Sequence, residues 1–368
     1  MTFYDIANGL DWKQIEQEIL QKTATDVETA LSKNTTLNIE DMKALVSPAA
    51  EPYLETMAQL SRKATQERFG KTIQFYIPIY LTNACLNHCI YCGFNHNNKI
   101  HRVILSDKEI LEEVKVIKDM GYEHLLLLTG ESPVHAGVDY IEHAMQLVRP
   151  YFKQLTLEVQ PLKAEEYRRL RDSGLYGVYV YQETYNQERY PIYHPAGLKH
   201  DYRWRLETPD RLGEAGVHKI GLGALLGLEN WRVESIFMAE HLRYLEKRYW
   251  RSRYSVAFPR IRPHEGTFQP QYNVTDKQFT QMIWAFRLFD HDLEMSLTTR
   301  ESPNMRNHMI SLGITSISAG SKTDPGGYAH ENELEQFSPN DNRDPKTMME
   351  MVKAQGYDVV WKDWDNFN

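Results

Sequence analysis

The cysteines of the chain are Cys85, Cys89 and Cys92, and they lie within eight residues of one another. Their pattern is C-x3-C-x2-C, which differs from the spread spacing of a disulfide framework. Three thiolates on one short loop can converge on one face of an iron–sulfur cube and bind three of its four irons. The fourth iron then lacks a protein ligand and can bind a substrate or cofactor. The cysteines therefore predict a [4Fe–4S] cluster with one open iron.

Two other interpretations of the cysteines remain weaker. A structural zinc site needs a fourth ligand, which His88 or His96 could supply. Such sites usually combine one C-x2-C pair with a second, distant pair, and the sequence contains no second pair. Three buried cysteines brought together by chance are disfavoured by the tight clustering.

The elements that must position this loop follow from the spacing of apolar residues. Residues 10–70 show helical periodicity, and Ser47-Pro48 resembles an N-cap followed by proline at the first helical position. From Thr72 onward, strand-like and helical segments alternate. The strand-like segments are Gln74–Leu81, His124–Leu128, Leu155–Val159, Gly177–Tyr181, Lys219–Ala224, Tyr254–Phe258, Glu294–Leu297 and Thr315–Ser318. The helical segments include Asp107–Met120, Ala164–Ser173, Pro209–Ala215, Trp231–Tyr249, Thr275–Phe289, Glu301–Ser311 and Pro345–Gln355.

Eight strands that alternate with helices predict an α/β protein with a closed, TIM-type (β/α)8 barrel, and a doubly wound open sheet is the alternative. We expect a helical N-terminal extension over residues 1–70, the barrel over 71–320, and a C-terminal extension over 321–368. This last part should form a long ordered loop and a helix that pack on the barrel. The active site of such a barrel lies where the strands run out into the following loops. The cysteine loop follows the first strand, so we expect it at that mouth.

Composition narrows the class of protein. The chain has 368 residues and a net charge of −8, and 42% of its residues are hydrophobic, which excludes pervasive disorder. The acidic balance and the lack of basic runs argue against nucleic-acid binding. No stretch approaches the roughly 18 apolar residues of a membrane helix. Residues 1–20 lack the basic start and apolar core of a secretory signal, so we expect a cytoplasmic enzyme.

A C-x3-C-x2-C loop after the first barrel strand resembles the radical S-adenosylmethionine (SAM) superfamily. Tyr91 and Phe94 flank the last cysteine, where that superfamily often places aromatic residues near adenine. The segment Gly223–Glu229 follows the fifth strand, where the superfamily's backbone and an apolar side chain, here Leu225, meet adenine. The resemblance implies that SAM binds the open iron and that its cleavage yields a 5′-deoxyadenosyl radical.

The resemblance also implies which polar residues bind SAM. Thr129, Gly130 and Glu131 end the second strand and are similar to the GGE motif that holds the SAM amino group. Glu183 ends the fourth strand, where relatives place an acid on the ribose hydroxyls. Arg205 is expected on the SAM carboxylate, with Arg203 as its rival. The competing roles are a charge near the next helix N-terminus for the first glutamate and a salt bridge at the barrel mouth for the second.

A closer resemblance runs from about residue 10 to the C-terminus. It is carried by segments such as FYIPIYLTNAC, LLLLTGE, VYQETY, WRLETPDRLGEAG, TRESP and SAGSKTDPGGY, which are similar to the tyrosine lyases of thiamine thiazole biosynthesis. This family cleaves the Cα–Cβ bond of L-tyrosine to 2-iminoacetate (dehydroglycine) and p-cresol, and it consumes SAM to 5′-deoxyadenosine and methionine.

Other members of the superfamily, and proteins outside it, are the alternatives. The hydrogenase maturase that also cleaves tyrosine carries further C-terminal cysteines for a second cluster, and this chain has no cysteine after Cys92. A maturase-like tyrosine lyase without that cluster and a lyase of another aromatic amino acid, such as tryptophan, remain alternatives. A non-catalytic iron–sulfur or zinc protein is a third class, for which the strand-end motifs would be superfluous.

The resemblance further implies residues for the substrate. Arg300, at the end of the seventh strand, is expected to clamp the tyrosine carboxylate, with Ser318 or Ser321 assisting at the eighth. The competing role for this arginine is an ion pair with Glu301, and Arg260 and Arg262 could also face the mouth.

The expected partners of the protein follow from the same family. The unstable imine product implies transfer to the thiazole synthase of the pathway. Reduced flavodoxin or ferredoxin is the expected electron donor, because neither a flavin site nor a second cluster site is visible in the sequence.

Overall fold

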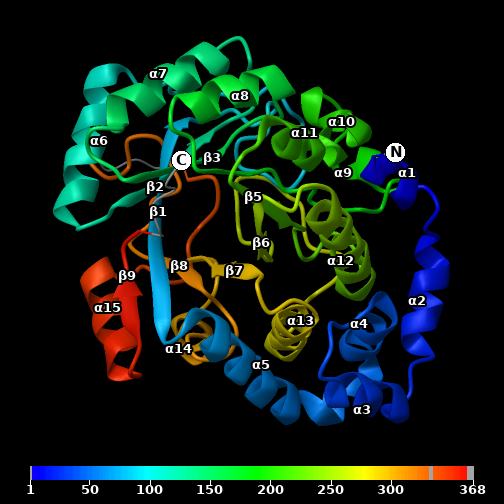
Figure 1. Cartoon of the computed structure of the whole chain (residues 1–368). Coiled ribbons are helices and arrows are strands. Elements are labelled where there is room, and N and C mark those ends of the chain that lie inside the picture. Colours follow the sequence, from blue (N-terminus) through cyan, green and yellow to red (C-terminus); the bar gives the residue numbers. More distant parts are fainter. Residues whose placement is uncertain (1, 331–334, 363–368) are drawn as a thin grey trace.

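The computed structural model describes residues 2–330 and 335–362, and its centre is a parallel barrel (Figure 1). The strands follow one another in chain order around the barrel, and β1 pairs with both β8 and β2 to close it. The predicted (β/α)8 barrel is thus confirmed, and the open-sheet alternative is wrong. The eight strands are β1 (Thr72–Thr82), β2 (His124–Thr129), β3 (Gln154–Glu158), β4 (Gly177–Tyr179), β5 (Lys219–Gly223), β6 (Arg253–Ala257), β7 (Glu294–Leu297) and β8 (Ser316–Ser318).

Strand β1 is the longest strand, and almost all of its side chains are buried. It pairs with β2 from Ile77 onward and with β8 over Gln74–Tyr76. Its first residues, Thr72–Gln74, also pair with a ninth strand, β9 (Asp358–Val360), that lies outside the barrel. The sequence did not predict β9, because three residues, one exposed and two half-buried, carry no readable alternation.

The barrel helices cover the outside of the strands. They are α6 (Asp107–Asp119), α7 (Val138–Val148), α8 (Ala164–Asp172), α11 (Thr208–Ala215), α12 (Trp231–Arg248), α13 (Asp276–Phe289) and α14 (Pro303–Met309), with α9 (Tyr190–Tyr193), η2 (Leu198–His200) and α10 (Tyr202–Leu206) between β4 and α11. Helix α14 begins later than expected. The Ser302 side chain accepts from the backbone N–H of Met305 and caps it, and Pro303 occupies its first turn.

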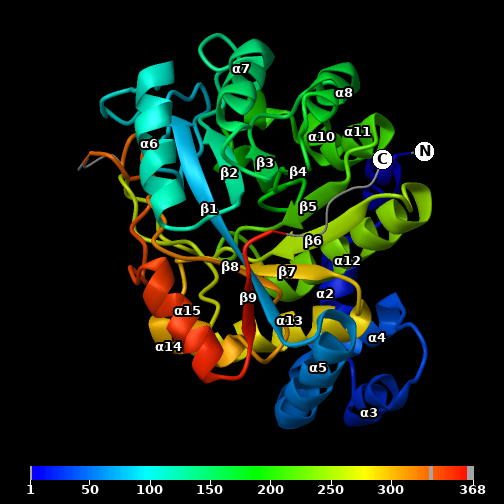
Figure 2. The same ribbon diagram turned by 60° about the vertical axis from the view of Figure 1, so that its left-hand side comes forward.

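The N-terminal extension wraps one side of the barrel (Figures 1 and 2). It consists of α1 (Phe3–Ala7), α2 (Trp12–Leu20), α3 (Ala24–Ser32), α4 (Ile39–Val46), the 3-10 helix η1 (Pro48–Tyr53) and α5 (Leu54–Phe69). Ser47 and Pro48 begin a helix as expected, and this helix starts as the 3-10 segment η1 before it continues as α5, because Pro52 cannot donate the hydrogen bond of an α-helix. At the junction with the barrel, Gln281 Nε2 donates to the carbonyls of Leu45 and Ser47 at 2.9 and 2.8 Å.

After β8 the chain crosses the barrel mouth before it forms α15 (Pro345–Ala354) and β9. Residues 331–334 of the long loop expected there lie outside the described residues. Gly320 has a φ of +63°, and its N–H donates to the carbonyl of Arg343, so the loop turns sharply where it leaves the barrel. Over the described residues, no helix combines the length and apolar character needed to cross a membrane.

Candidate active site

A cavity of about 190 Å³ opens at the C-terminal ends of the barrel strands. All of the candidate site residues line it, although they come from segments scattered between residues 85 and 321. These residues are Cys85, Cys89, Tyr91, Cys92, Phe94, Thr129, Gly130, Glu131, Glu183, Arg205, Leu225, Arg300, Ser318 and Ser321. Their shared location follows from the parallel barrel, because all strand ends point to one mouth.

The cysteine loop is held against the end of β2. The backbone N–H of Leu86 donates to the carbonyl of Glu131 at 3.0 Å. Gly130 permits this approach, because a Cβ at that position would lie 2.2 Å from the carbonyl oxygen of Ala84. On its other side, the N–H of Ile90 donates to the carbonyl of Tyr193 at 3.2 Å. The loop is thus fixed to the barrel by its backbone.

The three thiols form no disulfide and are free to bind a metal group. Burial raises the pKa of the Cys85 thiol to about 11, and coordination would remove that proton. Within the described part of the chain, no three His, Cys, Asp or Glu side chains surround one point as a single metal ion requires. The zinc alternative therefore gains no support, whereas the thiolates of a cube each bind a different iron. Three free thiols on one wall of a cavity fit a [4Fe–4S] cluster.

Four side chains of alternating charge form the wall beside the cysteine loop. Glu131 accepts from Arg205 at 2.8 Å, and Glu183 accepts from Lys199 at 2.6 Å. Arg205 also lies 3.8 Å from Glu183 and links the two pairs. Burial alone would raise the pKa of the Glu131 carboxyl, but the charges of Arg205 and Lys199 hold it below its usual range. Asn87 donates to the second carboxylate oxygen of Glu131 at 2.8 Å. The wall therefore keeps its ionised groups in fixed positions.

Arg205 and Arg203 lie in different surroundings. The Arg205 guanidinium is buried in the cavity wall, and its Nε donates to the carbonyl of Tyr181 at 2.6 Å. The Arg203 side chain is exposed and pairs with Glu207 at 3.0 Å. Of the two rivals, only Arg205 lines the cavity.

Arg300 and Glu158 both line the cavity and, within the described part of the chain, neither forms an ion pair. Glu301, the partner considered for Arg300 from the sequence, is instead bound by Arg260 through two nitrogens. Within residues 2–330 and 335–362, neither Arg300 nor Glu158 has a salt-bridge partner, and Nη1 of Arg300 donates to the carbonyl of Arg260 at 3.3 Å. Burial raises the pKa of the Glu158 carboxyl to about 7, and the charge of Glu183 adds to this shift. A cation and an acid without a direct ion-pair partner among the described residues thus share one cavity.

Three hydroxyl groups add polar atoms to the cavity. The hydroxyl of Ser318 contacts that of Tyr76, its partner across β1 and β8. The oxygens Oγ of Ser321 and Oγ1 of Thr129 are buried and have no hydrogen-bond partner within the described residues. Buried polar atoms without partners are uncommon in proteins, and in a cavity wall they are available to a ligand.

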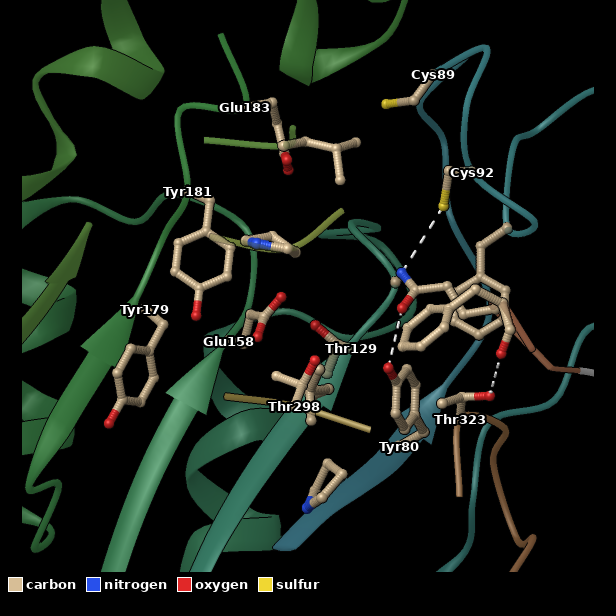
Figure 3. A pocket seen from close by; sticks show the side chains of 18 of the residues that line it. Tyr80, Cys89, Cys92, Thr129, Glu158, Tyr179, Tyr181, Glu183, Thr298 and Thr323 are labelled. Atoms are coloured by element: carbon tan, nitrogen blue, oxygen red, sulfur yellow. Dashed lines mark hydrogen bonds between the residues drawn. The ribbon is translucent and has the colours of Figure 1, made fainter. Parts of the chain in front are cut away.

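Aromatic side chains complete the walls. The Tyr91 hydroxyl donates to Nε2 of His194 at 2.7 Å, while the other ring nitrogen of His194 donates to the carbonyl of Tyr190. Phe94 packs edge to face on Tyr80 with ring centres 5.9 Å apart. Figure 3 shows Tyr179 and Tyr181 on the side away from Cys92, with the carboxyl group of Glu158 pointing into the space between. The cavity therefore combines an apolar lining with a few charged groups, as ligand sites usually do.

Several cavity residues were missed from the sequence. Glu158 ends β3 and could have been found by the strand-end rule that identified Glu131. Gln336 and Phe337 also line the cavity from a loop, and Lys199 lines it from the short helix η2, and no periodicity predicts the course of either segment. Arg262, which the sequence offered as a residue that could face the mouth, lines the cavity as well. Phe337 covers Arg300, with the guanidinium carbon 3.5 Å from the ring centre.

Known proteins resemble this chain in sequence and in fold. Residues 79–238 match the family model of the radical SAM superfamily, and residues 257–358 match that of the Biotin and Thiamin Synthesis associated domain. The crystal structure of HydG, a maturase of the [FeFe]-hydrogenase, superposes with a TM-score of 0.91 at 31% identity, over 95% of this chain and 80% of that one. Methylornithine synthase (PylB) superposes with a TM-score of 0.72 at 20% identity, over 91% and 97%, and shares the fold.

The sequence relatives are more specific. The chain is 51% identical to the 2-iminoacetate synthase of Escherichia coli (strain K12), over all of this chain and 97% of the relative. It is 50% identical to that of Salmonella typhimurium (strain LT2) over the same shares. Because half of its residues are shared over its full length, the chain belongs to the 2-iminoacetate synthase family of radical SAM enzymes.

Proposed function

We propose that the cavity binds SAM and L-tyrosine side by side and cleaves the Cα–Cβ bond of tyrosine to 2-iminoacetate and p-cresol. Cys85, Cys89 and Cys92 hold the [4Fe–4S] cluster in this proposal. When bound and reduced, the cluster and SAM supply a 5′-deoxyadenosyl radical that takes a hydrogen from the amino group of tyrosine. The observation that carries the proposal is the joint presence of three free thiols and the unpaired Arg300 and Glu158 in one cavity.

The charged wall suits the amino-acid end of SAM. We assign the SAM ammonium to Glu131 and the SAM carboxylate to Arg205. Nη1 of Arg205 donates to Glu131, whereas Nη2 lies 3.8 Å from Glu183 and can donate to the carboxylate. Glu183 is assigned to the ribose hydroxyls, and Tyr91, Phe94 and Leu225 to the adenine. Within the wall the two acids pair with Arg205 and Lys199, so their buried charges are compensated.

The other end of the cavity suits a zwitterionic amino acid. We assign the tyrosine carboxylate to Arg300, supported by Ser318 and Ser321, and its ammonium to Glu158. A guanidinium can bind a carboxylate through two parallel hydrogen bonds, which fixes the orientation of the substrate. Fixing the amino group close to the adenosyl carbon is the main requirement of hydrogen transfer.

The partners and location complete the proposal. We propose that reduced flavodoxin or ferredoxin supplies the electron and that the thiazole synthase of thiamine biosynthesis accepts the imine. Free thiols without a disulfide support a cytoplasmic location.

An anaerobic assay of the iron-reconstituted protein with SAM, L-tyrosine and dithionite tests the proposal. Mass spectrometry should detect 5′-deoxyadenosine, p-cresol and glyoxylate from the hydrolysed imine. Arg300→Lys should lower p-cresol formed per 5′-deoxyadenosine about tenfold or more, because a lysine cannot form the two-pronged contact. Arg203→Lys changes an exposed arginine outside the cavity and should behave as the wild type. 5′-Deoxyadenosine without p-cresol from the wild type would contradict tyrosine as the substrate.

A further inference from the structure

A short segment from the C-terminal part of the chain crosses the barrel mouth, and we call residues 335–341 the strap. Its backbone is tied to two loops of the mouth. The N–H of Gln336 donates to the carbonyl of Thr323 at 2.9 Å, and the N–H of Asn340 donates to that of Thr299 at 2.8 Å. The strap therefore holds its side chains at defined places over the cavity.

The Gln336 side chain lies between a cluster ligand and a tyrosine. Its Nε2 donates to Sγ of Cys92 at 3.7 Å, and its Oε1 accepts from the hydroxyl of Tyr80 at 2.9 Å. Figure 3 shows both contacts as dashed lines that begin at Cys92 and Tyr80. The tyrosine hydroxyl keeps the amide oxygen on its side, so the NH2 group is the part that faces the sulfur.

The backbone of the cysteine loop makes this approach possible. Gly93 follows Cys92 directly, and a Cβ at Gly93 would lie 2.6 Å from the carbonyl oxygen of Gln336. A larger residue would push the strap away from the loop. The Cys92 sulfur also receives a hydrogen bond from the backbone N–H of Phe94. Two N–H groups, one local and one from a segment more than 240 residues away, thus converge on one sulfur.

Hydrogen bonds to the ligand sulfurs are one of the factors that set the potential of an iron–sulfur cluster. An N–H dipole stabilises the extra negative charge of the reduced cluster more than the oxidised one, so it raises the reduction potential. We propose that Gln336 is a positioning residue that acts through Cys92 and makes the cluster easier to reduce. The proposal depends on cluster ligation by the three cysteines, which belongs to the proposed function, and not on the identity of the substrate.

A redox titration of the reconstituted full-length protein, followed by electron paramagnetic resonance without SAM or tyrosine, tests this role. Gln336→Leu removes the donor and should shift the potential downward. A tenfold fall in the ratio of reduced to oxidised cluster at a fixed potential corresponds to a shift of about 59 mV for one electron. Gln336→Glu keeps the shape and the acceptor for Tyr80 but places a negative charge at the sulfur. It should therefore shift the potential further down, which a packing role would not do.

Two further variants make the result decisive. Ser338→Ala changes an exposed strap side chain and should leave the potential unchanged. Tyr80→Phe removes the hydroxyl that fixes the orientation of the Gln336 amide. The NH2 group then faces the sulfur for only part of the time, so the potential should shift in the same direction as in Gln336→Leu, but less. Equal potentials in the wild type and both Gln336 variants, at equal iron content, would overturn the proposal. If Gln336→Leu loses its cluster, an unchanged potential in Gln336→Glu overturns it instead. A wild type that binds no [4Fe–4S] cluster would refute the proposed function itself.

Discussion

At the scale of residues, the charged side chains of the cavity fall into two groups, those with an ion-pair partner in the wall and those without one among the described residues. Glu131 and Glu183 have cationic partners within the wall, whereas Arg300 is covered by an aromatic ring and Glu158 faces the cavity. Burial lowers the pKa of the Arg300 guanidinium and raises that of the Glu158 carboxyl. A zwitterion that enters between them would relieve both costs of desolvation. In the proposed function, this pair of charges is what would distinguish an amino acid from an uncharged ligand.

The Glu158 carboxyl should make tyrosine binding depend on pH. Its pKa of about 7 means that the charged form exists above that pH and is lost as the pH falls through about 7. Tyrosine affinity should therefore weaken on acidification, in anaerobic titration calorimetry of the reconstituted protein with SAM. Glu158→Gln should weaken binding about tenfold or more, since hydrogen bonds to charged groups contribute about 1.5–3 kcal/mol, and should abolish the pH dependence. Glu188→Gln, an exposed glutamate, is the control. An unchanged pH profile in Glu158→Gln would refute the assignment.

At the scale of elements, the cysteine loop depends on the close contact between the ends of β1 and β2. The carbonyl of Thr82 accepts from the N–H of Gly130 at 2.8 Å, and that of Glu131 accepts from the N–H of Leu86. These bonds hold the loop beside the wall of four alternating charges without using any cysteine. The strap closes the opposite side, so the loop is enclosed by elements from both halves of the chain.

Gly130→Ala should separate the two strand ends. The added methyl would lie 2.2 Å from the carbonyl oxygen of Ala84. This is a backbone atom, so the clash can be relieved only if the whole segment after β1 moves away. Overpacking of this kind costs about 1–3 kcal/mol, so thermal unfolding should begin at a lower temperature and the reconstituted protein should hold less iron. Gly9→Ala, in an exposed turn, is the matched control. Full iron content with unchanged stability in Gly130→Ala would show that the strand ends can part freely.

At the scale of the whole molecule, the N-terminal extension and the barrel share one core. The side chains of Phe3 and His241 stack with ring centres 3.9 Å apart, which attaches α1 to α12. Arg232 of α12 donates to the carbonyl of Val46 at the end of α4. Together with the Gln281 contacts, these buried bonds indicate that the extension unfolds with the barrel and not before it.

Gln281→Leu should destabilise the whole chain and not only the extension. It leaves the carbonyls of Leu45 and Ser47 buried without their donor, and each unsatisfied group costs about 1–3 kcal/mol. Circular dichroism and intrinsic fluorescence should report one common transition at a lower Tm. Gln59→Leu, on an exposed helix surface, should leave the Tm near that of the wild type. A separate early transition in the variant would show that the two parts are independent.

The barrel was predictable because eight short segments with buried apolar side chains, such as Leu125–Leu128 in β2, alternate along the chain with helical segments. The strand-end residues, such as Glu131 and Arg300, followed from that prediction together with the family resemblance. Lys199 and Gln336 could not be predicted, because each is placed by a single long-range hydrogen bond of its backbone N–H, to Oδ1 of Asn87 and to the carbonyl of Thr323, respectively. Strand β9 was missed for the related reason that its pairing with β1, and not its composition, makes it a strand.

The closure of the barrel through β1 also constrains when the metal group can enter. Strand β1 and the cysteine loop leave the ribosome early, but their neighbours β8, the strap and β9 are made last. More than 270 residues follow Cys92, and at about 5–20 residues per second their synthesis takes roughly a quarter of a minute to a minute. Until then the wall around the three thiols lacks β8 and the strap. The enclosed cavity beside the cysteine loop therefore exists only after the C-terminal part of the chain has folded onto β1.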